Sequence, residues 1–170
     1  MKKIIIIFSL FILMISCNIG KRDVDASKKD MRDGIVYIIN EKKPFTGKLT
    51  DKYEDGKIRS EENFKDGKYE GIVKEYFPNG QVAFEGTFKD GQLNGEAKIY
   101  FENGQVKNIV NFVEDKINGV SKIYYDNGQL EGEYTFVDNQ FDGLFRKYSR
   151  DGKITNEAIF KNGKVEKIIK

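Results

Sequence analysis

The chain has 170 residues, with 29 Lys and Arg against 27 Asp and Glu, no His and a single Cys. It therefore cannot build a Cys/His zinc site, a His-dependent catalytic triad or a disulfide within the chain. Only two Pro and 13% aromatic residues exclude collagen-like and Pro-rich classes and indicate a folded chain.

The N-terminal segment 1–16 has a basic start followed by an apolar run over 4–15. That run is too short to span a bilayer, which needs about 20 apolar residues, and it fits the apolar region of a secretory signal peptide. It ends in the sequence MISC, which resembles the cleavage box of a bacterial lipoprotein. We therefore predict cleavage between Ser16 and Cys17 and attachment of acyl chains such as palmitate to Cys17. The alternative is a free thiol at the end of an uncleaved anchor.

Cleavage removes two of the 29 basic residues and none of the 27 acidic ones, so the mature chain is neutral. A neutral chain gives no electrostatic reason to expect nucleic acid as a partner. We expect a lipid-anchored protein of the cell envelope. It would lie in the outer membrane of a bacterium with two membranes, or otherwise on the outer face of the plasma membrane.

The segment 17–34 is rich in charge and poor in apolar residues. This composition predicts a flexible tether, in which a short helix over 26–32 is the one candidate element. The chain then divides into a signal peptide over 1–16, this tether over 17–34 and a repeat domain over 35–170.

From Gly47 onward the sequence repeats every 24 residues. Gly occupies the first and tenth positions of each unit and Phe the eighteenth, without insertions, which indicates a repeat architecture. The units start at Gly47, Gly71, Gly95, Gly119 and Gly143; the second glycines are Gly56, Gly80, Gly104, Gly128 and Gly152; the rings are Phe64, Phe88, Phe112, Phe136 and Phe160.

Each unit carries two turn signals, one at Asn79-Gly80 and its equivalents and one at Asp90-Gly91 and its equivalents. We predict two-residue type I′ hairpin loops for the first class, since Asn and Gly tolerate positive φ, and a looser turn at Glu114-Asp115. Between turns, apolar and polar residues alternate, which predicts strands. The fold class is all-β: a single-layer antiparallel meander of about twelve strands, built from five 24-residue hairpin repeats and curled into a trough, after an N-terminal signal helix.

A hairpin centred on Asn79-Gly80 places Phe88 opposite Gly71. We expect each repeat ring to cover the bare backbone of the glycine opposite it, and the glycines to let the sheet bend. The remaining ring–glycine pairs are Phe112 with Gly95, Phe136 with Gly119 and Phe160 with Gly143. The same register predicts cross-strand ion pairs, namely Glu85 with Lys74, Glu133 with Lys122 and Glu157 with Arg146.

The sequence YFPNGQVAFEGTFKDGQLNG over 76–95 and its 24-residue equivalents resemble the MORN repeat. The resemblance is to the bacterial variant, several members of which are grouped as a YwqK-like antitoxin family, and it covers about 45–164. It implies a sheet of hairpins, one per repeat. It implies little about function, because the motif residues are those that make the fold.

A ladder of aromatic and basic residues is the candidate binding face. We expect it to project from the polar face, with successive tyrosines about 9.5 Å apart, where it could grip an extended peptide or stack on sugar rings. The alternative is a solvated face whose tyrosines simply suit strands. The ladder consists of Tyr76, Tyr100, Tyr124 and Tyr148 beside Lys74, Lys98, Lys122 and Arg146.

The inner rings Phe88, Phe112 and Phe136 are either core or the lining of a ligand trough. A single layer leaves two outcomes for this face: residual exposed apolar surface, or a second copy that covers it and forms a homodimer.

No residue pattern points to catalysis. Glu61 and Glu62 are adjacent on a strand and so point to opposite faces, and the glycines form turns rather than a phosphate loop. The Asp-rich turns near Asp138 and Asp142 are the weak candidate for Ca²⁺. We predict no enzyme, no cofactor and no metal, and a non-catalytic surface that binds an unidentified protein. The alternative function, from the family resemblance, is an antitoxin-like or immunity-type neutralising protein.

Overall fold

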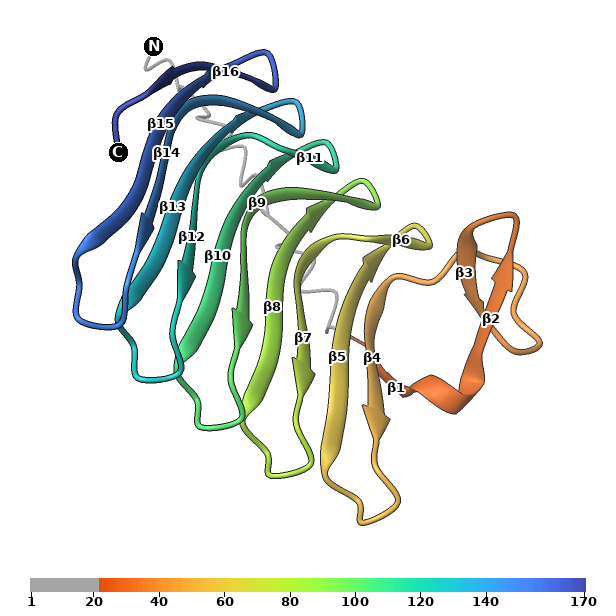
Figure 1. Ribbon diagram of the computed structural model, residues 1–170. Coiled ribbons are helices and arrows are strands. Elements are labelled where there is room, and N and C mark those ends of the chain that lie inside the picture. The colour runs from red at the N-terminus through yellow and green to blue at the C-terminus, as the bar shows by residue number, and fades with distance from the viewer. Residues whose placement is uncertain (1–21) are drawn as a thin grey trace, which may run out of the picture.

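The computed structural model describes residues 22–170 as two β-sheets (Figure 1). The large sheet has fourteen strands, and a second sheet has two. The predicted signal helix, the cleavage site and Cys17 lie outside the described residues. Within residues 22–170, no helix has the length and apolar character needed to cross a bilayer.

The strands follow one another in chain order across the large sheet, which stays open at both edges. All neighbours are antiparallel apart from β1 and β4, which are parallel. The elements are β1 (Asp23–Asp25), η1 (Ala26–Lys28, a 3-10 turn), β2 (Lys29–Arg32), β3 (Ile35–Ile38), β4 (Gly47–Lys52), β5 (Ile58–Lys65), β6 (Lys68–Tyr69), β7 (Gly71–Tyr76), β8 (Val82–Lys89), β9 (Gln92–Tyr100), β10 (Val106–Val113), β11 (Lys116–Ile117), β12 (Gly119–Tyr124), β13 (Leu130–Val137), β14 (Gln140–Tyr148), β15 (Ile154–Lys161) and β16 (Lys164–Ile168). The predicted meander of hairpins is confirmed.

The loops of the Asn79-Gly80 class differ from the prediction. Only the glycine has a positive φ, +89° at Gly80. The N–H of Phe77 donates to the carbonyl of Gln81 at 2.8 Å, and the N–H of Gly80 donates back to the carbonyl of Phe77 at 2.8 Å. This is a three-residue loop, a type I turn closed by a left-handed glycine, rather than a two-residue type I′ loop.

The three-residue loops of the Asn79-Gly80 class are called the long loops below. A bulge in each hairpin that ends in a long loop compensates for the extra loop residue. Tyr76 pairs with Val82 but Glu75 pairs with Phe84, so that Ala83 has no partner of its own. Beyond the bulge the predicted register holds. The same bulge recurs in every repeat, at Arg59, Ala83, Lys107, Glu131 and Thr155.

The turns of the Asp90-Gly91 class, called the short turns below, are the type I′ turns of this fold. Both central residues have positive φ even at Glu114 (+49°) and Asp115 (+63°), so the looser turn predicted there is wrong. Consecutive turns are tied together: the N–H of Asp115 donates to the carbonyl of Leu93 at 3.0 Å, and a carboxylate oxygen of Asp115 accepts from the N–H of Leu93 at 2.7 Å. This exchange stabilises the one turn that lacks both Asn and Gly.

The predicted register of rings and glycines is confirmed, but its reason is corrected. Phe88 lies opposite Gly71 and Phe112 opposite Gly95, and the ring lies opposite the glycine in the other repeats as well. No heavy atom lies within 4 Å of where a Cβ of Gly71 would stand, and the atom nearest that position at Gly95 belongs to Thr87, at 3.4 Å. The rings therefore do not cover these glycines. The glycines are needed for their positive φ, +88° at Gly71 and +121° at Gly95.

Aromatic rings cover glycines elsewhere, two residues away on the same strand. A Cβ at Gly86 would lie 2.6 Å from Cζ of Phe84, and Tyr134 occupies the corresponding space at Gly132. The ring in these cases lies along its own strand, over the glycine, instead of reaching across to the neighbouring strand.

The main core lies between the two-stranded sheet β2–β3 and the first strands of the large sheet. Figure 1 shows this hairpin beside β4. Val36 and Ile38 of β3 pack against a buried residue of the loop between β3 and β4 and against buried residues of the first repeat. The ammonium of Lys29 in β2 lies 2.7 Å from a carboxylate oxygen of Glu62. The cluster consists of Val36, Ile38, Phe45, Leu49 and Phe64, with Val24, Ala26 and Tyr69 packed against it.

The flexible tether predicted over 17–34 is therefore wrong for residues 22–34. These residues form β1, η1 and β2, and the helix predicted over 26–32 is replaced by one 3-10 turn and a strand. The physical reason is that the few apolar side chains among the charges, Val24 and Ala26, find the uncovered end of the sheet.

Past the first repeat the apolar face lacks such a cover among the described residues. The repeat rings there are half-buried and lie in one row near the short turns. The rings of Phe136 and Phe141 have centroids 4.6 Å apart, and those of Phe141 and Phe160 5.2 Å apart. Their stabilisation comes from neighbouring strands, as expected for a repeat array.

We predict that Gly71→Ala destabilises the protein by about 1–2 kcal/mol, because the left-handed backbone disfavours a Cβ even where space is free. The measurement is the midpoint of urea unfolding. Gly71→Asn is the matched control and should cost less, since Asn tolerates this backbone. An unchanged midpoint for Gly71→Ala would show that positive φ is not the reason for glycine here.

Candidate functional site

The predicted tyrosine ladder lies on the polar face, and its tyrosines are half-buried. Each one pairs with an aliphatic residue on the next strand, for example Tyr76 with Val82 and Tyr100 with Val106. The hydroxyl of Tyr76 donates to a carboxylate oxygen of Glu61 at 2.7 Å. Burial, followed by this bond to the carboxylate, raises the pKa of Tyr76 to about 12.

The cations beside the tyrosines have partners on the same face. Lys74 lies 3.0 Å from Glu85, as the register predicted. Lys98 instead pairs within its own strand with Glu96, at 2.8 Å, and this bond raises the pKa of Lys98. The other predicted pairs form as well: Lys122 with Glu133 at 3.7 Å, and Arg146 Nε with Glu157 at 2.9 Å. That this ladder binds a partner stays a prediction.

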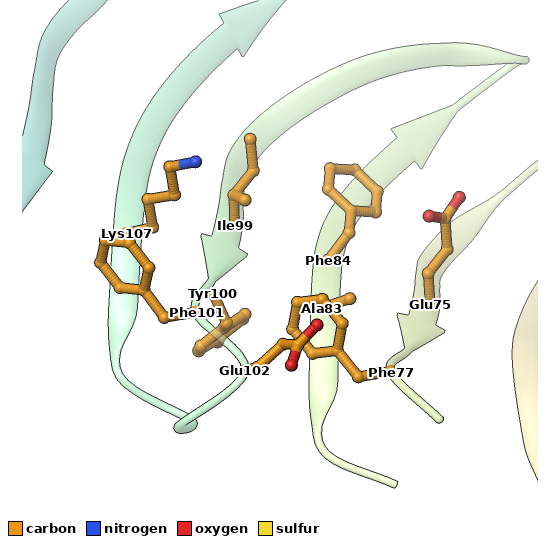
Figure 2. A pocket seen from close by; sticks show the side chains of 9 residues that line it. All are labelled: Glu75, Phe77, Ala83, Phe84, Ile99, Tyr100, Phe101, Glu102 and Lys107. Carbon is orange, nitrogen blue, oxygen red and sulfur yellow. The ribbon is translucent and has the colours of Figure 1, made fainter. Parts of the chain in front are cut away.

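The apolar face carries a groove that the sequence did not predict. A cavity of about 610 Å³ opens beside the long loops of the second and third repeats. Its floor is formed by Phe84 of β8 and Ile99 of β9, and Phe77 and Phe101 stand at its sides (Figure 2). The lining is completed by Glu75, Ala83, Tyr100, Glu102 and Lys107.

Charged side chains stand at the two ends of this groove. Glu75 of β7 lies at one end and Lys107 of β10 at the other, with the apolar floor between them (Figure 2). Both are exposed, and neither has an ion-pair partner among residues 22–170. The ammonium of Lys107 lies 5.6 Å from the ring centroid of Phe101, which holds it over the groove.

The groove is formed by positions that differ from repeat to repeat. The residue equivalent to Phe84 is Asn108 in the next unit and Gly132 in the one after. The bulge residue Lys107 is equivalent to Ala83. Only the second and third repeats therefore combine a ring, an aliphatic floor and opposite charges at this place.

A second hollow of about 460 Å³ continues from the groove toward the first repeat. It shares Glu75, Phe77 and Ala83 with the groove and is otherwise polar. Its carboxylate Asp51 is already paired with Arg59. The free carboxylate at the junction of the two hollows is thus Glu75.

Two polar side-chain atoms are buried beyond the Lys107 end of the groove. Asn108 Oδ1 and Ser121 Oγ are covered and have no hydrogen-bond partner in the described structure. Ser121 is only 5% exposed. These residues interrupt the apolar face in the third and fourth repeats and so limit the groove to the repeats before them.

The described residues contain no group of three or more Asp, Glu, Cys or His that could hold a metal ion. The groove contributes carboxylates, an ammonium and apolar surface, but no nucleophile paired with a base. Such a site can recognise a ligand by shape and charge.

A family model, the MORN repeat variant, matches residues 45–66, 69–90, 93–114, 117–138 and 141–162. The chain belongs to the MORN repeat variant family. The five matched segments each begin within the short-turn end of one repeat and end in the next short turn, which fits the observed 24-residue period. No curated protein matches the chain. Membership of this family supports a repeat protein that binds or scaffolds, and a non-catalytic one.

We predict that Tyr76 contributes stability that is lost at high pH. Because its pKa is raised from 10.0 to about 12 in the folded chain, its contribution is complete below pH 10 and disappears as the pH rises toward 12. The Cζ chemical shift of Tyr76, followed by NMR against pH, measures its pKa directly. Glu61→Gln should lower the Tyr76 pKa, and an unchanged value would contradict the role of the carboxylate.

We predict that Ser121→Ala stabilises the protein by about 1 kcal/mol, because it removes a buried hydroxyl that has no partner. Ser60→Ala is the matched control: Ser60 is also buried, at 9% exposed, but its hydroxyl is not among the unsatisfied atoms. Urea unfolding of both variants gives the comparison. A loss of stability in Ser121→Ala would mean that the hydroxyl has a bound partner.

Proposed function

We propose that this protein is an envelope-anchored lipoprotein whose repeat sheet binds another protein without catalysing a reaction. The anchor would be Cys17, acylated after cleavage of the signal peptide. The observation that carries the binding role is the uncovered groove on the apolar face, with its aromatic side chains and its unpaired charges of both signs. An exposed apolar site of this kind in a folded chain marks an interaction surface.

The partner is proposed to be a protein because the groove is long, open and lies across several strands. Apolar floor, aromatic residues at the sides and charges at the rim form the usual anatomy of a protein interface. A neutral mature chain gives little attraction to nucleic acid or to anionic lipid, so membrane contact is assigned to the acyl anchor. A neutralising role, as in the antitoxin-like members, is the special case in which the bound protein is a toxin.

We predict that radioactive palmitate labels the wild-type protein in growing cells and does not label Cys17→Ser. The reason is that Cys17 is the only thiol in the chain. Ser16→Ala is the matched control and should keep its label, since a small residue remains before the cysteine. Equal label in the wild type and Cys17→Ser would overturn the anchor.

We predict that a photo-crosslinking amino acid at Ile99 captures a partner protein in intact cells. Val120 is the matched control site, because both residues are 40% exposed while Val120 lies on the polar face. An adduct at Ile99 alone supports binding through the groove. An adduct at Val120 alone supports the tyrosine ladder instead, and adducts at neither site would overturn the protein-binding role.

A further inference from the structure

The charges at the two ends of the groove lie on strands that are not neighbours. Glu75 belongs to β7 and Lys107 to β10, and β8 and β9 lie between them. Adjacent strands are separated by about 4.8 Å, so the two charged positions lie about 14 Å apart across the sheet. This separation is too large for the two groups to neutralise each other, and an occupant of the groove would meet both.

The spacing fits an extended polypeptide that runs across the strands. An extended chain rises about 3.3 Å per residue, so residues four apart are separated by about 13 Å. In an extended chain, alternate side chains point to the same side, so the first, third and fifth residues of such a segment would all face the groove. The third residue would then lie over Phe84 and Ile99, midway between the charges.

We infer that the groove binds an extended segment of the partner with the pattern basic-x-apolar-x-acidic, in either chain direction. The basic residue meets Glu75, the apolar residue lies on the floor of Phe84 and Ile99, and the acidic residue meets Lys107. This inference rests on the proposed function, since it specifies what the bound protein presents.

The aromatic sides of the groove reinforce this selection. Phe101 lies beside Lys107 and Phe77 lies on the loop side of Phe84, so both add aromatic surface that an apolar side chain can contact (Figure 2). Lys107 is already held over the ring of Phe101 and thus approaches an incoming carboxylate from a fixed position. Beyond Lys107 the face becomes polar at Asn108, which sets the end of the apolar contact.

The repeats themselves supply a contrast. The residues equivalent to Glu75 in the third and fourth units are Ile99 and Ile123, and in the fifth Lys147. The residue equivalent to Lys107 in the fourth unit is Glu131. The arrangement of carboxylate, ring, aliphatic residue and ammonium therefore occurs once along the array, and we expect one such site per chain.

The test uses the full-length protein in detergent and a fluorescein-labelled peptide, acetyl-Lys-Ser-Leu-Ser-Glu-amide, followed by fluorescence anisotropy. Glu75→Lys and Lys107→Glu should each weaken binding about fivefold, because each replaces an attraction at an exposed site with a repulsion. The double reversal Glu75→Lys with Lys107→Glu should restore binding, since the peptide can turn end for end.

Lys147→Glu is the matched control. Lys147 also lies over an aromatic ring, 5.9 Å from the centroid of Phe145, but outside the groove, and its reversal should leave peptide binding unchanged. Each variant should remain folded because Glu75 and Lys107 are both exposed, and urea unfolding checks this. Equal binding by the wild type and both single variants would overturn the inference.

The crosslinking experiment separates this inference from the proposed function. Capture at Ile99 that neither single reversal diminishes would overturn the charge pattern and leave the protein-binding role intact. Capture of this same chain at Ile99, with a dimer that excludes the peptide, would make a second copy the occupant and overturn the inference. The inference is supported if each single reversal reduces capture at Ile99 and the double reversal restores it.

Discussion

The register between successive hairpins is the constraint on which the rest of this molecule depends. A strand that slips by one residue turns every side chain to the opposite face. Each long loop here adds one residue and each bulge takes one up, as at Gly80 and Ala83, so that the 24-residue period returns to the same face. The row of repeat rings and the row of ion pairs both follow from this compensation.

A single layer of strands has no second layer to cover its apolar face. The only extensive cover among the described residues is the β2–β3 hairpin, and the main buried cluster lies beneath it. Farther along, the array replaces apolar residues by polar ones on the same face, as at Asn108 and Ser121. The groove lies between these two regions, where the face is still apolar and no longer covered. Its position thus follows from the cover on one side and from this polar interruption of the apolar face on the other.

Much of the fold could be predicted from spacing alone. Strand positions, the pairing of Phe88 with Gly71 and the ion pair of Lys74 with Glu85 all followed from a fixed period and the turn positions. The turn type did not follow, because Asn-Gly suits both a type I′ turn and a type I turn with a left-handed glycine. Pro78, at the first central position of the loop, favours the second kind and was the available signal.

The parts that could not be predicted depend on contacts that repetition does not report. The role of Gly95 requires knowing that its positive φ directs a Cβ toward Thr87 and away from any ring. Val24 lies within a charged segment whose composition resembles a tether, yet it packs on the core. The groove was missed because the prediction followed residues that recur, such as Tyr100, whereas Phe84 and Lys107 are exceptions to the repeat.

This division has a consequence for how such arrays acquire specificity. The recurring glycines and rings fix backbone and register, so they are not free to change when a new partner is recognised. The bulge positions are not constrained in this way, since consecutive repeats carry Ala83 and Lys107 at the same place. Recognition in this chain can therefore change by substitution at and next to the bulges while the scaffold stays the same.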